Sequence, residues 1–136
     1  MWRCVGLFRH GGMADVEYAY RVYRTHLEQS EIAARAPFTM LELGPGDSAL
    51  SAVFACAHRV GRSLLVDVAN CAERDPEVYY RVAKLLRERR LPAADLDGSE
   101  DFAAVWDKCR VDYLTGGLQS LRSVSRRKQA ASLGAA

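Results

Sequence analysis

The 136-residue chain lacks the features that mark several large classes of protein. No apolar run approaches the ~20 residues that a helix needs to cross a bilayer, and residues 1–10 are too interrupted by arginine for a signal peptide. The three histidines are scattered and form no metal-ligand cluster. The 19 basic and 17 acidic side chains nearly cancel to a net charge of +2, which favours neither a nucleic-acid binder nor a membrane-surface protein. What is left is a small globular protein of one domain.

Cysteine is sparse, and its spacing carries no signature. Cys4, Cys56, Cys71 and Cys109 include no pair at C-x-x-C spacing, and two of them lie in apolar helical patterns, where a free cysteine behaves as a small hydrophobe. We therefore predict reduced thiols in a cytoplasmic protein, without a disulfide or a metal site.

Hydrophobic periodicity predicts helices that alternate with short strands. Helical spacing covers residues 15–36, 48–59, 75–90 and 99–109, and strand-like apolar runs cover 38–43, 63–68, 113–115 and 118–124. The unit over 38–68 has the size of a βαβ unit, which implies parallel strands and a right-handed crossover. We expect an α/β, Rossmann-like three-layer sandwich over 15–124, with an N-terminal extension at 1–14 and a disordered basic tail at 125–136.

The most informative stretch lies between the first predicted strand and the helix after it. It contains Glu42, Gly44 and Gly46, and Asp67 follows at the end of the next strand, 21 residues after Gly46. Glycines at the carboxyl end of a strand let a ligand approach the backbone in front of a helix N-terminus. An acid ~20 residues further on can accept both hydroxyls of a ribose.

Two ligand classes fit this geometry. Gly44, Gly46 and Ala49 match the G-x-G-x-x-A fingerprint of dinucleotide sites, whereas Glu42, Gly44 and Gly46 match the E-x-G-x-G motif of S-adenosylmethionine-dependent methyltransferases. The Glu42 carboxylate suits a ligand with a cationic methionyl end and would repel a pyrophosphate. The non-functional alternative is an ordinary strand–turn–helix in which Glu42 and Asp67 contact only water.

Three segments together resemble the class I methyltransferase-domain family, and more narrowly its small-molecule or glycan-associated group, often labelled type 11-like. They are Leu41-Glu42-Leu43-Gly44-Pro45-Gly46-Asp47-Ser48, Leu65-Val66-Asp67-Val68, and the run from Tyr113 to Val124. The resemblance implies S-adenosyl-L-methionine as cofactor, with Glu42, Gly44 and Gly46 along its methionine side and Asp67, followed by Val68, at its ribose. It implies methyl transfer to an acceptor that fold alone does not identify. Because positioning can carry such a reaction, we name no catalytic residue.

Two departures from the family pattern bear on this expectation. Gly116 and Gly117 stand where family members often carry an acid near the adenine, and after Val124 the chain continues as Ser125-Arg126-Arg127-Lys128 instead of a fourth strand. The resemblance therefore implies a partial domain, the cofactor-binding half, truncated or frameshifted after about three strands. A nicotinamide-dependent oxidoreductase fragment stays an alternative. So does a non-catalytic module that forms a homo-oligomer through an exposed sheet edge.

Several aromatic and titratable side chains have both a functional and an ordinary interpretation. Tyr18, Tyr20 and Tyr23 could cover a cofactor, but a tyrosine-rich helix face more often packs in a core. His26 could serve as a general base, but a lone histidine on a helix is more often a surface or capping residue.

Overall fold

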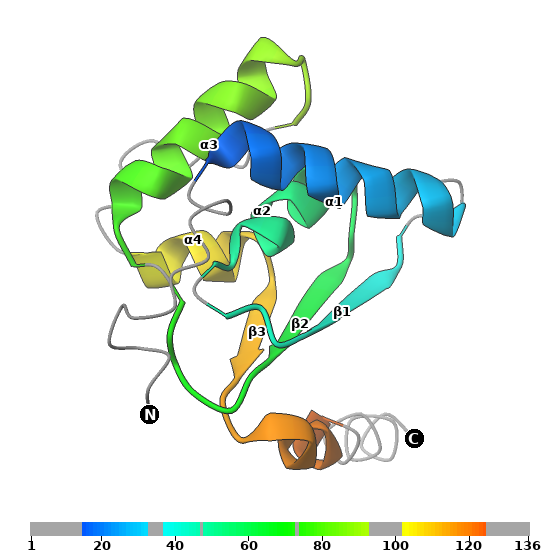
Figure 1. Ribbon diagram of the computed structural model, residues 1–136, viewed down its shortest axis with the longest axis vertical. Coiled ribbons are helices and arrows are strands. Elements are labelled where there is room, and N and C mark those ends of the chain that lie inside the picture. Colours follow the sequence, from blue (N-terminus) through cyan, green and yellow to red (C-terminus); the bar gives the residue numbers. More distant parts are fainter. Residues whose placement is uncertain (1–14, 33–36, 47, 73, 93–101, 125–136) are drawn as a thin grey trace, which may run out of the picture.

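The structure is a computed structural model, and it describes residues 15–32, 37–46, 48–72, 74–92 and 102–124 (Figure 1). The predicted N-terminal extension at 1–14 and the predicted tail at 125–136 lie outside these residues. Within the described ranges, no helix is long and apolar enough to cross a membrane.

The centre of the fold is a parallel sheet of three strands. They are β1 (Thr39–Leu43), β2 (Arg62–Val66) and β3 (Val111–Leu114), in the order β1-β2-β3. Leu41 of β1 pairs with Leu64 of β2, and Leu64 pairs in turn with Asp112 of β3. The sheet confirms the predicted α/β class and its parallel strands.

Helices connect and cover these strands, and two of them begin where the sequence places an acid. Asp15 caps α1 (Val16–Ser30) by accepting the Glu17 and Tyr18 N–H groups at 2.9 and 3.2 Å. Asp75 caps α3 (Pro76–Glu88), whose proline stands in the first helical position. The other helices are α2 (Leu50–Ala57), α4 (Phe102–Lys108) and a 3-10 turn, η3 (Gly117–Ser120).

The core lies between the sheet and the layer formed by α1, α2 and α3. Tyr20 of α1 meets Phe54 of α2 edge to face at 5.2 Å, and Tyr79 of α3 is fully buried in the same cluster. Right-handed crossovers that step in one direction across a sheet place α2 and α3 on a common face, and α1, which precedes β1, packs on both of them (Figure 1). Leu41 and Leu43 alternate onto the other face, where they are 50% and 58% exposed.

Two expectations about the chain are wrong. Residues 118–124 were expected to have strand character, but they form η3 and a helical turn over 121–124. The Ser120 and Ser123 hydroxyls donate to carbonyls three residues earlier, and such local bonds compete with sheet pairing. Cys56 and Cys109 are free thiols as predicted, but Cys71 is disulfide-bonded. Disulfide formation depends on the approach of two sulfurs in space, which sequence spacing does not reveal.

Candidate functional site

The turn after β1 depends on two glycines. Gly44 has φ +70° and Gly46 has φ +68°, a left-handed conformation that side chains rarely adopt. The Gly44 N–H donates to the Val66 carbonyl at 2.8 Å, which holds the turn against the end of β2. A Cβ atom added at either glycine would meet no atom within 4 Å, so the turn leaves its outer surface open to a ligand.

Asp67 forms hydrogen bonds that connect the carboxyl ends of the three strands. Its Oδ2 accepts the Gly46 N–H at 3.0 Å and its Oδ1 accepts the Val68 N–H at 2.6 Å. Its main chain donates to the Leu114 carbonyl and accepts the Gly117 N–H, both at 2.8 Å. The 21-residue spacing in the sequence therefore corresponds to a direct contact between the acid and the glycine turn.

The same contacts limit how Asp67 could bind a ribose. Each carboxylate oxygen can accept two hydrogen bonds, so the described residues leave one acceptor position on each oxygen beyond the two backbone donors. Asp67 is only 7% exposed, however, and a ribose would reach these positions only if the glycine turn moved away from the carboxylate.

Val68 and the residues after β3 form an apolar rim beside this turn. Val68 is 76% exposed and Leu118 is 64% exposed. Gly117 has φ +62°, a conformation that favours glycine, and a Cβ added there would make an ordinary contact at 3.6 Å with the Val68 Cγ1 atom, so the two segments lie side by side. Residues 117–124 lie beyond the carboxyl ends of the strands (Figure 1). An exposed apolar rim of this kind suits the flat face of a purine.

Glu42 belongs to the same strand as the glycine turn, but its carboxylate faces the helical layer. It accepts a hydrogen bond from the Ser51 hydroxyl of α2, and no bond joins it to Gly46 or Asp67 in the described residues. Burial raises the pKa of the Glu42 carboxyl, while the Ser51 hydrogen bond and the positive form of His26 lower it. The structure therefore brings four of the five predicted residues together and leaves the Glu42 carboxylate on the helical side.

The sequence analysis did not single out Ser51, and it favoured a surface position for His26, which the structure shows exposed at the groove. Ser51 carries the one hydroxyl in α2, which is the signal that could have singled it out. His26 borders the same groove as Glu42, between α1 and β1, although 16 positions separate the two residues. A helix face and a strand come together only in the folded chain, so the sequence spacing of His26 and Glu42 does not predict that they lie close together.

The site thus consists of a glycine turn, a backbone-bound aspartate, an apolar rim and a partly buried glutamate. Among the described residues, no three histidine, cysteine or acidic side chains gather in a way that could hold a metal ion. No protein-family model matches the chain, and the comparisons with curated proteins and with solved structures likewise find no match.

Proposed function

We propose that the chain is an S-adenosylmethionine-dependent methyltransferase domain that binds its cofactor at the glycine turn. The observation that supports this most is the hydrogen bond between the Gly46 N–H and the Asp67 carboxylate. It joins the turn after one parallel strand to the acid after the next, at the sheet edge where α/β proteins bind nucleotide-type ligands.

The available groups match the parts of S-adenosylmethionine in chemical character. The remaining acceptor positions of Asp67 suit a ribose diol, and the rim of Val68 and Leu118 suits the purine. The methionyl end carries an ammonium and a carboxylate. Glu42 suits the ammonium in charge, although its carboxylate lies on the helical side of β1. The start of α2 offers the carboxylate little, because the Leu50 N–H donates to the Ser48 hydroxyl and Ala49 is fully buried.

A nicotinamide dinucleotide fits the same turn less well. Its pyrophosphate would have to lie near the turn that follows Glu42, where two like charges repel. The partial burial of Glu42 strengthens this repulsion because fewer water molecules screen the carboxylate. The same burial favours a cationic partner, and this difference supports the methyltransferase interpretation over the dinucleotide one.

The bound cofactor would supply a methyl group activated by a sulfonium. The residues of this chain would bind the two ends of the cofactor and hold its sulfonium in a fixed direction. Such positioning contributes up to ~7–11 kcal/mol in well-oriented reactions, so a protein nucleophile is not required. The acceptor is not identified by the fold, and we assign no acid or base to it.

Titration calorimetry with S-adenosylhomocysteine and with NADH tests the proposal. We expect the former to bind and the latter not to bind. Asp67→Asn and Glu42→Gln should each weaken binding of S-adenosylhomocysteine about tenfold, the loss of one charge-assisted hydrogen bond. Asp107→Asn and Glu88→Gln, at exposed positions on α4 and α3, are the matched controls. Binding of NADH alone, or equal affinity in all variants, would contradict the proposal.

A second candidate function is an interaction module that pairs with another copy of itself. The half-exposed Leu41 and Leu43 support it, because parallel sheets are usually covered on both faces. The strand that carries them, β1, is also an edge of the described sheet. Sedimentation equilibrium should then detect a dimer that Leu43→Lys dissociates and that Tyr18→Lys, at a 41% exposed site on α1, leaves intact. A monomer at all concentrations would exclude this candidate.

A further inference from the structure

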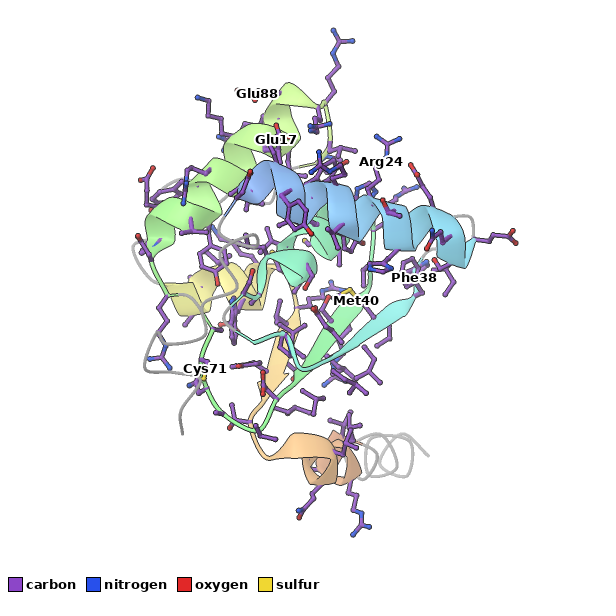
Figure 2. All side chains as sticks on the ribbon, in the orientation of Figure 1. Glu17, Arg24, Phe38, Met40, Cys71 and Glu88 are labelled. Atoms are coloured by element: carbon purple, nitrogen blue, oxygen red, sulfur yellow. The ribbon has the colours of Figure 1, made fainter. Side chains whose placement is uncertain are left out.

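A groove runs between α1 and β1, along the β1 edge of the sheet and apart from the glycine turn. Its volume is about 490 Å³, which lies within the range of small-molecule pockets. Most of the lining is apolar, with Val22 and Leu27 on α1 opposite Phe38 and Met40. Figure 2 labels Phe38 and Met40 between β1 and α1.

The polar groups of the groove converge on one carboxylate. Glu42 and Ser51 line it together, and their hydrogen bond fixes the carboxylate against α2. His26 and Tyr23 approach from α1. Burial raises the pKa of the Tyr23 hydroxyl, so this group stays neutral and can donate a hydrogen bond.

Glu42 differs from other acids in the described part of the chain. Glu17, Glu28 and Asp112 each have an arginine within 2.6 Å, namely Arg89, Arg24 and Arg62. Glu42 is less exposed than Glu17 and Glu28, yet its one hydrogen-bond partner among the described residues is a neutral hydroxyl. A carboxylate removed from water is unfavourable unless a cation or several donors compensate it. The positive form of His26 compensates it from the edge of the groove, and a ligand ammonium inside the groove would add donors directly to the carboxylate.

We propose that the groove binds a small protonated amine with an apolar body, whose ammonium group pairs with Glu42. The ammonium supplies hydrogen-bond donors and a positive charge to a carboxylate that has one neutral donor. The apolar body displaces water from Val22, Leu27, Phe38 and Met40. A carboxylate ligand would meet like charge at Glu42, and a neutral alcohol would add no positive charge to that of His26.

The amine groove and the proposed cofactor site are different places on the molecule, and Glu42 is the residue that both use. The ammonium of a methionyl group and the ammonium of the amine would compete for that carboxylate. The amine does not need the glycine turn or Asp67, because neither lines the groove. The two proposals can therefore fail separately.

Chemical-shift titration with phenethylamine tests the inference, with 2-phenylethanol and 3-phenylpropionate as neutral and anionic analogues. We expect phenethylamine to shift resonances of Val22 and Met40 and to bind at least about tenfold more tightly than either analogue. Glu42→Gln should remove this preference, while Glu88→Gln, an exposed site on α3, should keep it. Val22→Phe, which fills the groove, should weaken binding of both phenethylamine and the alcohol.

The outcomes separate the two proposals. Loss of S-adenosylhomocysteine binding in Asp67→Asn with unchanged phenethylamine binding supports two sites that share only Glu42. Failure of S-adenosylhomocysteine to bind, with phenethylamine still selected by charge, removes the proposed function and keeps the groove. Equal binding of the amine and the alcohol, or no shifts up to about 1 mM, overturns the amine site.

Discussion

Replacement of Gly46 by alanine tests whether the turn at the candidate site is held in its left-handed conformation. Gly46 has φ +68°, and a Cβ added there meets no atom within 4 Å. The substitution therefore adds no steric clash, and its whole effect on the folded state comes from the backbone conformation. That conformation is unfavourable by roughly 1–2 kcal/mol for a residue with a Cβ.

Gly116 provides the matched control for this substitution. Its φ is −93°, and an added Cβ would lie at an ordinary 3.5 Å from the Ser120 Cβ atom. Both substitutions remove the same freedom from the unfolded chain, which by itself stabilises a protein by about 0.4–1 kcal/mol. This contribution cancels when the two variants are compared. Gly46→Ala should therefore be less stable than Gly116→Ala by roughly 1–2 kcal/mol.

Urea unfolding followed by circular dichroism measures this difference. With a slope of about 2 kcal/mol/M for a chain of this size, the midpoints of the two variants should differ by about 0.5–1 M. The slopes should agree, because neither substitution changes the surface exposed on unfolding. Coincident midpoints would refute the reasoning, because the turn would then not hold Gly46 at a positive φ.

Three further predictions concern single side chains. Burial raises the pKa of the Glu42 carboxyl, so folding favours its neutral form. Glu42→Gln should therefore raise the free energy of unfolding at pH 7. This gain in stability should vanish below about pH 4, where the carboxyl is neutral in both the folded and the unfolded state. Ser63 is 1% exposed and its hydroxyl has no hydrogen-bond partner among the described residues, so Ser63→Ala should stabilise the fold by about 1 kcal/mol in urea unfolding. A hydrogen bond from Cys109 lowers the pKa of the Cys56 thiol to about 7. The rate at which iodoacetamide alkylates Cys56, followed by peptide mass spectrometry, should therefore be half-maximal near pH 7. This midpoint should shift to higher pH in Cys109→Ala.

The βαβ unit could be predicted from the sequence because its signals are local. The predicted strands over 38–43 and 63–68 correspond to Thr39–Leu43 and Arg62–Val66, and Pro76 begins a helix as its position indicates. Apolar runs bounded by glycine leave few alternative structures, so sequence and structure agree to within two residues at most ends. The contact between Gly46 and Asp67 follows from this unit, because parallel strands bring their carboxyl ends together.

What could not be predicted depends on side-chain direction and on competing local signals. Glu42 was assigned to the cofactor side by its spacing from Gly44, but spacing does not say that its carboxylate turns toward Ser51. Leu118, Leu121 and Val124 recur every three residues, which is the period of a 3-10 helix, yet their apolar character also fits a strand. The local bonds of Ser120 decide between the two structures.

Asp67 and Glu42 differ in how many of their hydrogen-bond acceptor positions are already occupied in the folded chain. This difference determines which of the two carboxylates can contribute more binding energy to a ligand. A ligand that recruits Asp67 must move the Gly46 N–H or share the carboxylate with it, so part of each new hydrogen bond replaces an existing one. A ligand that reaches Glu42 adds donors to a carboxylate that has a single hydroxyl partner among the described residues. Substitution of Asp67 should therefore reduce stability in parallel with cofactor affinity, because the turn loses its anchor. Substitution of Glu42 by glutamine should raise the free energy of unfolding and at the same time reduce the affinity for cations. A residue that lowers stability but improves binding is one that is retained for binding.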